Sequence, residues 1–215
     1  MININEEMYR CILLGKIDRF KEILEQGGDP NYNIRGVPPI FMAINRNKMD
    51  FLEILINHPD IDLNITNLQG YTILNECLST NNNYVLNILL SNLLFVESLS
   101  GKGDYPIHTV IKYDRQDLLE KILSYKKNFL NSLNSEGDTP ITLAAKLKNK
   151  SISEVLIKYN PDLTVVNKKG KTVLDYFIDN NWNEIIRDIE NNKQEKQTDE
   201  SSNGTEVSQI KRRRK

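Results

Sequence analysis

The stretch GDTPITLAA, residues 137–145, contains the features that decide the fold of this chain. It opens with Gly137, and Thr139 and Pro140 precede a run of apolar and small residues. Glycine adopts a positive φ at little steric cost, which suits a tight turn. Proline is well tolerated in the first turn of a helix, where the backbone N–H has no partner inside the helix. The stretch therefore predicts a turn that leads directly into a helix.

Four other stretches have the same form and stand in register with this one. They read GVPPIFMA, GYTILNEC, GDYPIHTV and GKTVLDYF, and successive glycines lie 33 or 34 residues apart. An Asn or a Ser, both common in turns, stands three residues before each glycine. A fixed period of this length is the signature of stacked structural repeats. The five glycines are Gly36, Gly70, Gly103, Gly137 and Gly170.

These stretches resemble the ankyrin repeat, whose signature is G-x-T-P-L-H-x-A at a period of about 33 residues. Residues 137–145 keep the Gly, Thr, Pro and Ala of the signature, and residues 103–110 keep its His as His108. The turn of the second half of the repeat appears as GGDPN, residues 27–31. The resemblance covers residues 5–192. It implies an all-α ankyrin-repeat solenoid of about six helix-turn-helix units with short turn or hairpin connections.

The residues between the glycines agree with this division. Phe51, Ile54 and Leu55 show the helical spacing of apolar side chains. Because two short helices cannot bury their apolar faces alone, neighbouring pairs must stack. We divide an ankyrin-repeat domain at 1–192 into units 1–36, 37–70, 71–103, 104–137, 138–170 and 171–192, with a cap at each end.

The composition of the chain changes near its last unit. In WNEIIRDIENNK, residues 182–193, apolar side chains alternate with charged ones so that one face of a helix is apolar and the other polar, as an end repeat requires. Residues 193–215 contain only Val207 and Ile210 as aliphatic residues. So little apolar surface does not offset the entropy cost of ordering, and we expect a disordered polar tail.

Length and composition restrict the class of protein. The 215 residues have a net charge of -1 and a hydrophobic content of 39 %, so no global charge favours nucleic acid or a membrane surface. The sequence has no hydrophobic run near 18 residues, and its first 20 residues lack the features of a secretory signal. With Cys11 and Cys77 as its two cysteines, the chain has no disulfide framework, and we expect an intracellular location.

The sequence shows no constellation of catalytic or metal-binding residues. His108 occupies the His position of the ankyrin signature, where the resemblance implies a bridge between turn backbones. His58 lies in a loop between units and is expected to be solvated. Cys11 and Cys77 match the small-residue position of the repeat, so we expect buried, inert thiols that lie too far apart for a disulfide. We expect no enzyme activity, no metal and no cofactor.

The resemblance implies a partner-binding groove, formed by the turn tips and by the exposed side of the first helix of each unit. Tyrosine and methionine are types suited to binding surfaces, which draws attention to Tyr71, Met42 and Tyr176. The predicted helix positions are Arg10, Met42, Glu76, Thr109, Leu143 and Tyr176. The predicted tip positions are Arg35, Val37, Gln69, Tyr71, Lys102, Asp104, Glu136, Asp138, Lys169 and Lys171.

The third unit departs from the repeat pattern. LLFVES, residues 93–98, belongs to a segment that replaces the expected turn, and it places Phe95 where other units have Asp62 and Asp162. The next unit has Phe129 at the same position. Two phenylalanines on adjacent turns could form an exposed apolar patch for a partner, or they could pack on each other and close the longer loop. The sequence leaves both alternatives open.

The sequence ends in the basic run KRRRK, which is typical of a nuclear localisation signal or of a solubilising end. Five charges alone bind nucleic acid only weakly, so nucleic acid is not the expected partner. The residues of this run are Lys211, Arg212, Arg213, Arg214 and Lys215.

The leading functional hypothesis is a non-enzymatic, monomeric protein–protein interaction module that binds a partner protein as a scaffold, inhibitor or assembly factor. One alternative is a viral or intracellular-microbe ankyrin effector that acts on a host protein. Another is a nuclear regulator that uses the basic tail. We expect a cytoplasmic location without membrane association, and a nuclear one as well if the basic run acts as an import signal. The fold alone does not name the partner.

Overall fold

The structure is a computed structural model that describes residues 3–92, 99–101, 103–125 and 127–191. The described residues form helices, turns and isolated bridges, and none of them belongs to a strand. The chain divides into two parts, residues 1–135 and residues 136–215. The all-α fold of paired helices expected from the sequence is confirmed.

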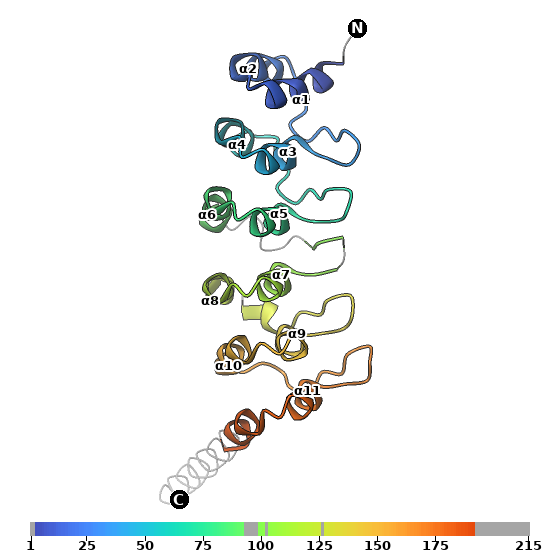
Figure 1. Ribbon diagram of the computed structural model, residues 1–215, viewed down its shortest axis with the longest axis vertical. Coiled ribbons are helices and arrows are strands. Elements are labelled where there is room, and N and C mark those ends of the chain that lie inside the picture. The colour runs from blue at the N-terminus through green and yellow to red at the C-terminus, as the bar shows by residue number, and fades with distance from the viewer. Residues whose placement is uncertain (1–2, 93–98, 102, 126, 192–215) are drawn as a thin grey trace, which may run out of the picture. The chain divides into compact units, whose positions relative to one another are not determined.

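The first part consists of stacked pairs of short helices (Figure 1). The helices α1, α3, α5 and α7 lie on the side of the projecting turns, and each packs on the next. The helices α2, α4, α6 and α8 each pack on the preceding helix of their pair. The elements are α1 Ile4–Leu14, α2 Ile17–Glu25, α3 Pro39–Asn45, α4 Met49–Ile56, α5 Ile73–Ser79, α6 Asn83–Asn92, α7 Pro106–Lys112, α8 Gln116–Tyr125 and the 3₁₀ helix η1 Lys127–Asn131.

The second part continues the same pattern with α9 (Pro140–Lys146), α10 (Lys150–Lys158) and α11 (Val173–Asp179). The helix α9 packs on both α10 and α11. Residues 183–191 are also helical. Each pair of helices falls within one of the six units defined from the sequence, whose boundaries stay a prediction.

The first helix of each later unit begins at a defined sequence signal. Pro39, Pro106 and Pro140 are the first residues of α3, α7 and α9, as expected. Where proline is absent, threonine caps the helix. Thr72 and Thr172 each form a capping box, in which the Thr side chain and the residue three positions later satisfy each other's backbone N–H groups.

The five repeated glycines form the turns between units, and all of them have a positive φ. The turns also contact one another closely. The N–H of Leu68 donates to the carbonyl of Gly36 at 2.8 Å, and the N–H of Gly101 donates to the carbonyl of Gly70 at 2.7 Å. A Cβ on Gly70 would lie 2.8 Å from the Cα of Gly101, closer than real Cβ contacts. Glycine therefore supplies both the turn conformation and the space that the neighbouring turn occupies.

A second left-handed position, not predicted from the sequence, joins the two helices of each pair. It recurs at almost the same period as the glycines, but its residue type varies. Asn and Asp tolerate this region better than other non-glycine residues. The residues are Gly15, Asn47, Asn81, Asp114, Lys148 and Asn181.

The core lies between the helix pairs and consists of Ile, Leu, Val and Phe side chains. The rings of Phe20 and Phe51 meet edge to face, with centroids 5.0 Å apart, and so link the first two units. Cys11 and Cys77 are both free and buried, as expected. Burial raises the pKa of both thiols, which keeps them protonated and unreactive at neutral pH.

The last described helix has the polar and apolar faces expected of an end unit. Ile185 and Ile189 are buried, Ile186 is half-buried, and the ring centroid of Trp182 lies 5.6 Å from that of Phe177. The charged residues between them are exposed. The predicted polar tail, residues 193–215, lies outside the described residues, as does its basic run Lys211 to Lys215.

Candidate partner-binding surface

Three of the six predicted groove positions on helices are accessible. Arg10 is exposed on α1, and Met42 and Tyr176 are half-buried on α3 and α11. Tyr71, at the turn before α5, has 37 % of its surface exposed. These four residues fit the expected binding surface, and their role in binding stays a prediction.

The other three helix positions are buried, so the expectation that they face solvent is wrong. Glu76 accepts a hydrogen bond from Asn67 Nδ2 at 3.3 Å, and Thr109 accepts one from Asn75 Nδ2 at 3.3 Å. Leu143 lies on α9, which is only seven residues long and packs against α10 and α11. Register along such short helices locates a position but does not reveal how much the neighbouring unit covers it.

The predicted tip positions also divide into buried and accessible residues. Asp104 and Asp138 are buried, Val37 and Lys171 are half-buried, and Lys102 lies outside the described residues. The remaining tip positions are exposed: Arg35, Gln69, Glu136 and Lys169.

The two buried tip carboxylates are each neutralised within their own unit. Asp104 pairs with Lys112 at 2.5 Å, and Asp138 pairs with Lys146 at 2.8 Å, in both cases eight residues later. Burial alone would lower the pKa of Lys146, but its hydrogen bond to Asp138 and the carboxylate charge outweigh burial and leave that pKa raised. The sequence contains a signal for these ion pairs that was not used. An acidic residue directly follows the repeat glycine, and a lysine stands eight residues later.

The last turn carries the same pair with its charges exchanged. Lys171 contacts Asp179 at 2.6 Å, and both side chains are partly exposed. The ammonium of Lys171 also lies 5.3 Å from the ring centroid of Tyr176. Asn167 Nδ2 donates to Asp138 at 2.6 Å and to the Tyr176 hydroxyl at 3.1 Å. The second part therefore holds Tyr176 in a fixed position beside its turns.

The first part contains a pocket of about 230 Å³ on this surface, which we call the tyrosine pocket. Tyr71 and Tyr113 line it and have 37 % and 39 % of their surfaces exposed. Burial of the hydroxyl, with the nearby Tyr71 and Glu76, raises the pKa of Tyr113 and keeps it neutral. The tyrosine pocket consists of Tyr71, Asn75, Ser100, Asp104, Lys112 and Tyr113.

The repeat register predicts Tyr71 as a binding residue but not Tyr113, which caps the C-terminus of α7. The position after the last helical residue is not among the family's binding positions, so register offered no signal for it. A tyrosine at the end of an apolar helix was the sequence feature that could have indicated this binding position.

Phe129 is not part of an exposed patch. It lies on η1 and is 7 % exposed, and its ring centroid is 5.5 Å from that of Tyr105. For Phe129, the exposed-patch alternative is therefore wrong, because this aromatic contact and α8 cover the ring. Phe95 lies outside the described residues, so its own packing stays a prediction.

The two histidines lie in different surroundings. His108 is fully buried on α7, with its ring centroid 6.2 Å from that of Tyr105. His58 is half-buried and accepts a hydrogen bond from the N–H of Asp60 at 3.2 Å. Within the described ranges, no three His, Cys, Asp or Glu residues are grouped so that they could hold a metal ion. Nor does the described part of the chain have a helix long and apolar enough to cross a membrane.

A comparison with protein families identifies the fold family. The family described as "Ankyrin repeats (3 copies)" matches residues 8–98 and again residues 107–199, which together are most of the chain. The chain belongs to the ankyrin-repeat family. Ankyrin repeats generally mediate protein–protein interactions, and the fold is typically a binding scaffold without enzymatic activity.

Two curated relatives are long proteins of which this chain matches a small share. It is 25 % identical over 122 residues, or 56 % of its length, to the human transient receptor potential cation channel subfamily A member 1. It is 28 % identical over 89 residues, or 41 % of its length, to alpha-latrocrustotoxin-Lt1a of Latrodectus tredecimguttatus. The chain spans 11 % and 6 % of these relatives, respectively.

Solved structures are similar over more of the chain. A chain of the Bd0816 predatory endopeptidase from Bdellovibrio bacteriovorus in complex with immunity protein Bd3460 superposes with a TM-score of 0.63 and 23 % identity, covering 81 % of this chain and 91 % of that one. EF0377, an ankyrin repeat protein, superposes with a TM-score of 0.66 and 18 % identity, covering 83 % and 93 %. At these identities the similarity shows the fold alone.

Proposed function

We propose that this chain binds a partner protein through the tip-facing surface of residues 1–135, with the tyrosine pocket as the centre of the contact. The observation that carries the proposal is the pair Tyr71 and Tyr113, each more than a third exposed on the rim of one pocket. Tyrosine is enriched among residues that dominate binding energy, because it offers large contact area and a hydroxyl at low entropic cost.

The base of the pocket supports recognition of polar groups. The ion pair of Asp104 with Lys112 keeps the Lys112 ammonium fixed beside the tyrosines, and that side chain is still 40 % exposed. A partner carboxylate or carbonyl would meet an ammonium whose position is already set, which lowers the entropy cost of binding. The surface is therefore suited to a partner segment with both an apolar and an acidic or carbonyl group.

One pocket is too small for a stable complex. A specific interface buries about 800 Å² on each partner, so neighbouring units must contribute. Arg10 on α1 and Met42 on α3 present accessible side chains in the units before Tyr71. We therefore extend the proposed contact along the first four units.

Inhibition of the bound partner is the role we favour among scaffold, inhibitor and assembly factor. The similar fold found in a complex of an endopeptidase with an immunity protein supports that role, although it concerns another protein. An intracellular location is part of the proposal, because both buried cysteines are free thiols. Use of Lys211 to Lys215 as a nuclear import signal is tested by deleting them and comparing the distribution of a tagged chain.

The experiment begins with affinity purification of the tagged chain and identification of bound proteins by mass spectrometry. Calorimetry then compares the wild type with a variant carrying Tyr71→Ala and Tyr113→Ala. We expect this variant to lose about 2 kcal/mol or more of binding free energy with a nearly unchanged melting temperature. Tyr125→Ala is the matched control, since Tyr125 is 59 % exposed at the end of α8 and away from the pocket. Equal losses for both variants would contradict the assignment.

A further inference from the structure

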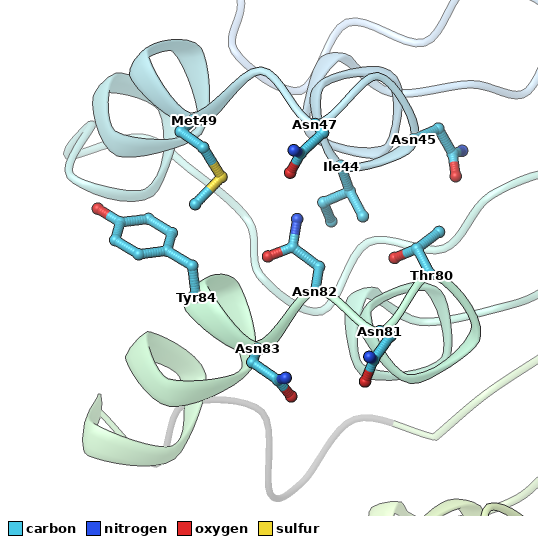
Figure 2. A pocket seen from close by; sticks show the side chains of 9 residues that line it. All are labelled: Ile44, Asn45, Asn47, Met49, Thr80, Asn81, Asn82, Asn83 and Tyr84. Carbon is cyan, nitrogen blue, oxygen red and sulfur yellow. The ribbon is translucent and has the colours of Figure 1, made fainter.

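A second cavity in residues 1–135 lies away from the tyrosine pocket and shares no residue with it. It has a volume of about 450 Å³ and lies at the connection of α3 to α4 and the connection of α5 to α6 (Figure 2). We call it the asparagine pocket. Its lining is Ile44, Asn45, Asn47, Met49, Thr80, Asn81, Asn82, Asn83 and Tyr84.

Asn82 is the central polar residue of this pocket. It is 8 % exposed, and its Oδ1 accepts the N–H of Val85 at 3.1 Å, which caps the start of α6. Its Nδ2 therefore points the other way, into the pocket and toward Asn47 (Figure 2). This Nδ2 is not a buried atom but is open to the pocket, where it can donate to a bound group. Because the Oδ1 bond to Val85 holds the amide in place, an acceptor would replace water at a donor whose position is already set.

Both loops that frame the pocket have fixed conformations. Asn47 and Asn81 occupy the left-handed region with φ near 51° and 53°, respectively. The N–H of Lys48 donates to Ala43 at 2.9 Å, and the N–H of Asn82 donates to Cys77 at 2.8 Å, which closes each loop onto its preceding helix. The amides are therefore in place before any ligand arrives, which reduces the ordering cost of binding.

The chemistry of the lining defines the ligand class. No Asp, Glu, Lys, Arg or His lines the pocket, so a charged group would enter without a counter-charge. Asn47 and Asn82 offer amide groups, while Met49 and Tyr84 lie together at one end and form an apolar wall (Figure 2). An amino-acid residue of a peptide would fit this lining. Its peptide group would lie against the amides, and its side chain would lie against the adaptable apolar wall.

We propose that the asparagine pocket binds an uncharged peptide segment, whose carbonyl accepts from Asn82 Nδ2 and whose aliphatic side chain packs on Met49 and Tyr84. A sugar is the less suitable ligand. It would present hydroxyls on most sides, and stacking would need a ring on the floor of the pocket, whereas Tyr84 stands beside Met49 at one end. The site is independent of the proposed function and of the tyrosine pocket.

The test uses the full chain and three capped tripeptides, acetyl-Ala-X-Ala-amide, with Leu, Glu or Lys at X. Nuclear magnetic resonance follows the side-chain amide signals of Asn82 and Asn47 during titration to millimolar concentration. We expect saturable shifts with the Leu peptide and binding about 5- to 10-fold weaker for the Glu and Lys peptides. N-acetylglucosamine, titrated in parallel, should leave both signals unchanged.

Asn82→Ser is the decisive variant, because serine still caps α6 but lacks the amide donor. It should weaken binding of the Leu peptide about 5- to 10-fold while the melting temperature stays close to that of the wild type. Asn149→Ser is the matched control, since Asn149 caps α10 through the same kind of contact to Ile152, at 3.0 Å, outside the pocket. The control should bind as tightly as the wild type.

Three outcomes would overturn the proposal. They are unchanged peptide binding by Asn82→Ser, shifts from the sugar instead of the peptide, and no shift of the Asn82 amide with any probe. The variant carrying Tyr71→Ala and Tyr113→Ala should still bind the Leu peptide, because the two pockets share no residue. Failure of one site is therefore distinguishable from failure of the other.

Discussion

Two left-handed positions recur along the repeats, and they accept different residues. The position that recurs at the turns between units is always glycine, whereas the one between paired helices is Asn, Asp, Lys or, once, glycine. Conformation alone therefore does not exclude a side chain. The difference comes from space, because the neighbouring turn lies against Gly70 and nothing within 4 Å lies against Gly15. At Gly36, Gly70, Gly103 and Gly137 the repeated glycine thus reports a contact with the following turn, which Gly170 lacks.

Gly70→Ala should have the largest effect among substitutions at these turns. The added Cβ would have both an unfavourable φ and a contact of 2.8 Å with the backbone of Gly101. We expect a loss of about 3 kcal/mol in the free energy of unfolding, measured by urea denaturation. Gly15→Ala is the control, because Gly15 has a φ of +71° with nothing within 4 Å of an added Cβ, and it should lose about 1 kcal/mol. Equal losses would show that spacing between turns is unimportant.

Gly170→Ala should have an intermediate effect and separates the two causes. Gly170 has a φ of +73°, but a Cβ there would meet no described atom within 4 Å. Only the conformational cost remains, so we expect a loss of about 1 kcal/mol. Gly137→Ala, with the backbone nitrogen of Lys168 at 3.2 Å, should cost more in the same denaturation experiment. The reverse order would contradict the role assigned to the neighbouring turn.

Lys148→Gly should have the smallest effect and the opposite sign. Lys148 joins α9 to α10 with a φ of +58°, a conformation that lysine adopts with strain. Glycine removes that strain and loses some chain entropy, so we expect a net stabilisation of about 0.5 kcal/mol. A measurable rise in the urea midpoint would support this, and a fall would indicate that the lysine side chain makes a stabilising contact.

The sequence was sufficient to predict the family, the all-α repeat fold and the glycine turns, because the same letters recur in register. The sequence also predicted that α3, α7 and α9 begin at proline and that the two cysteines are buried. Both predictions follow from the residue type and its position in the repeat. The second left-handed position escaped notice because Asn47, Asp114 and Lys148 share a conformation but no letter.

The binding surface was only partly predictable. Tyr71 follows a repeat glycine and was identified by register, but Glu76 and Thr109 at equivalent helix positions are covered by hydrogen-bonded neighbours. The burial of these two side chains depends on side chains from adjacent units, such as Asn75. The period of the repeat does not specify the identity of those neighbouring side chains. The asparagine pocket was not predictable for the same reason, since its walls come from two connections, residues 46–48 and 80–82, that lie 34 residues apart in the chain.

The ion pairs behind the turns have a consequence for how such chains change by duplication. Asp104 with Lys112, Asp138 with Lys146 and Lys171 with Asp179 each lie inside one period of the repeat. A recombination event that copies or removes a whole period therefore carries a carboxylate together with its counter-ion. A copy of one of these three units placed elsewhere in the array would bring its tip charge together with the counter-ion, even where the order of the two charges is reversed. These pairs therefore do not oppose a change in the number of repeats.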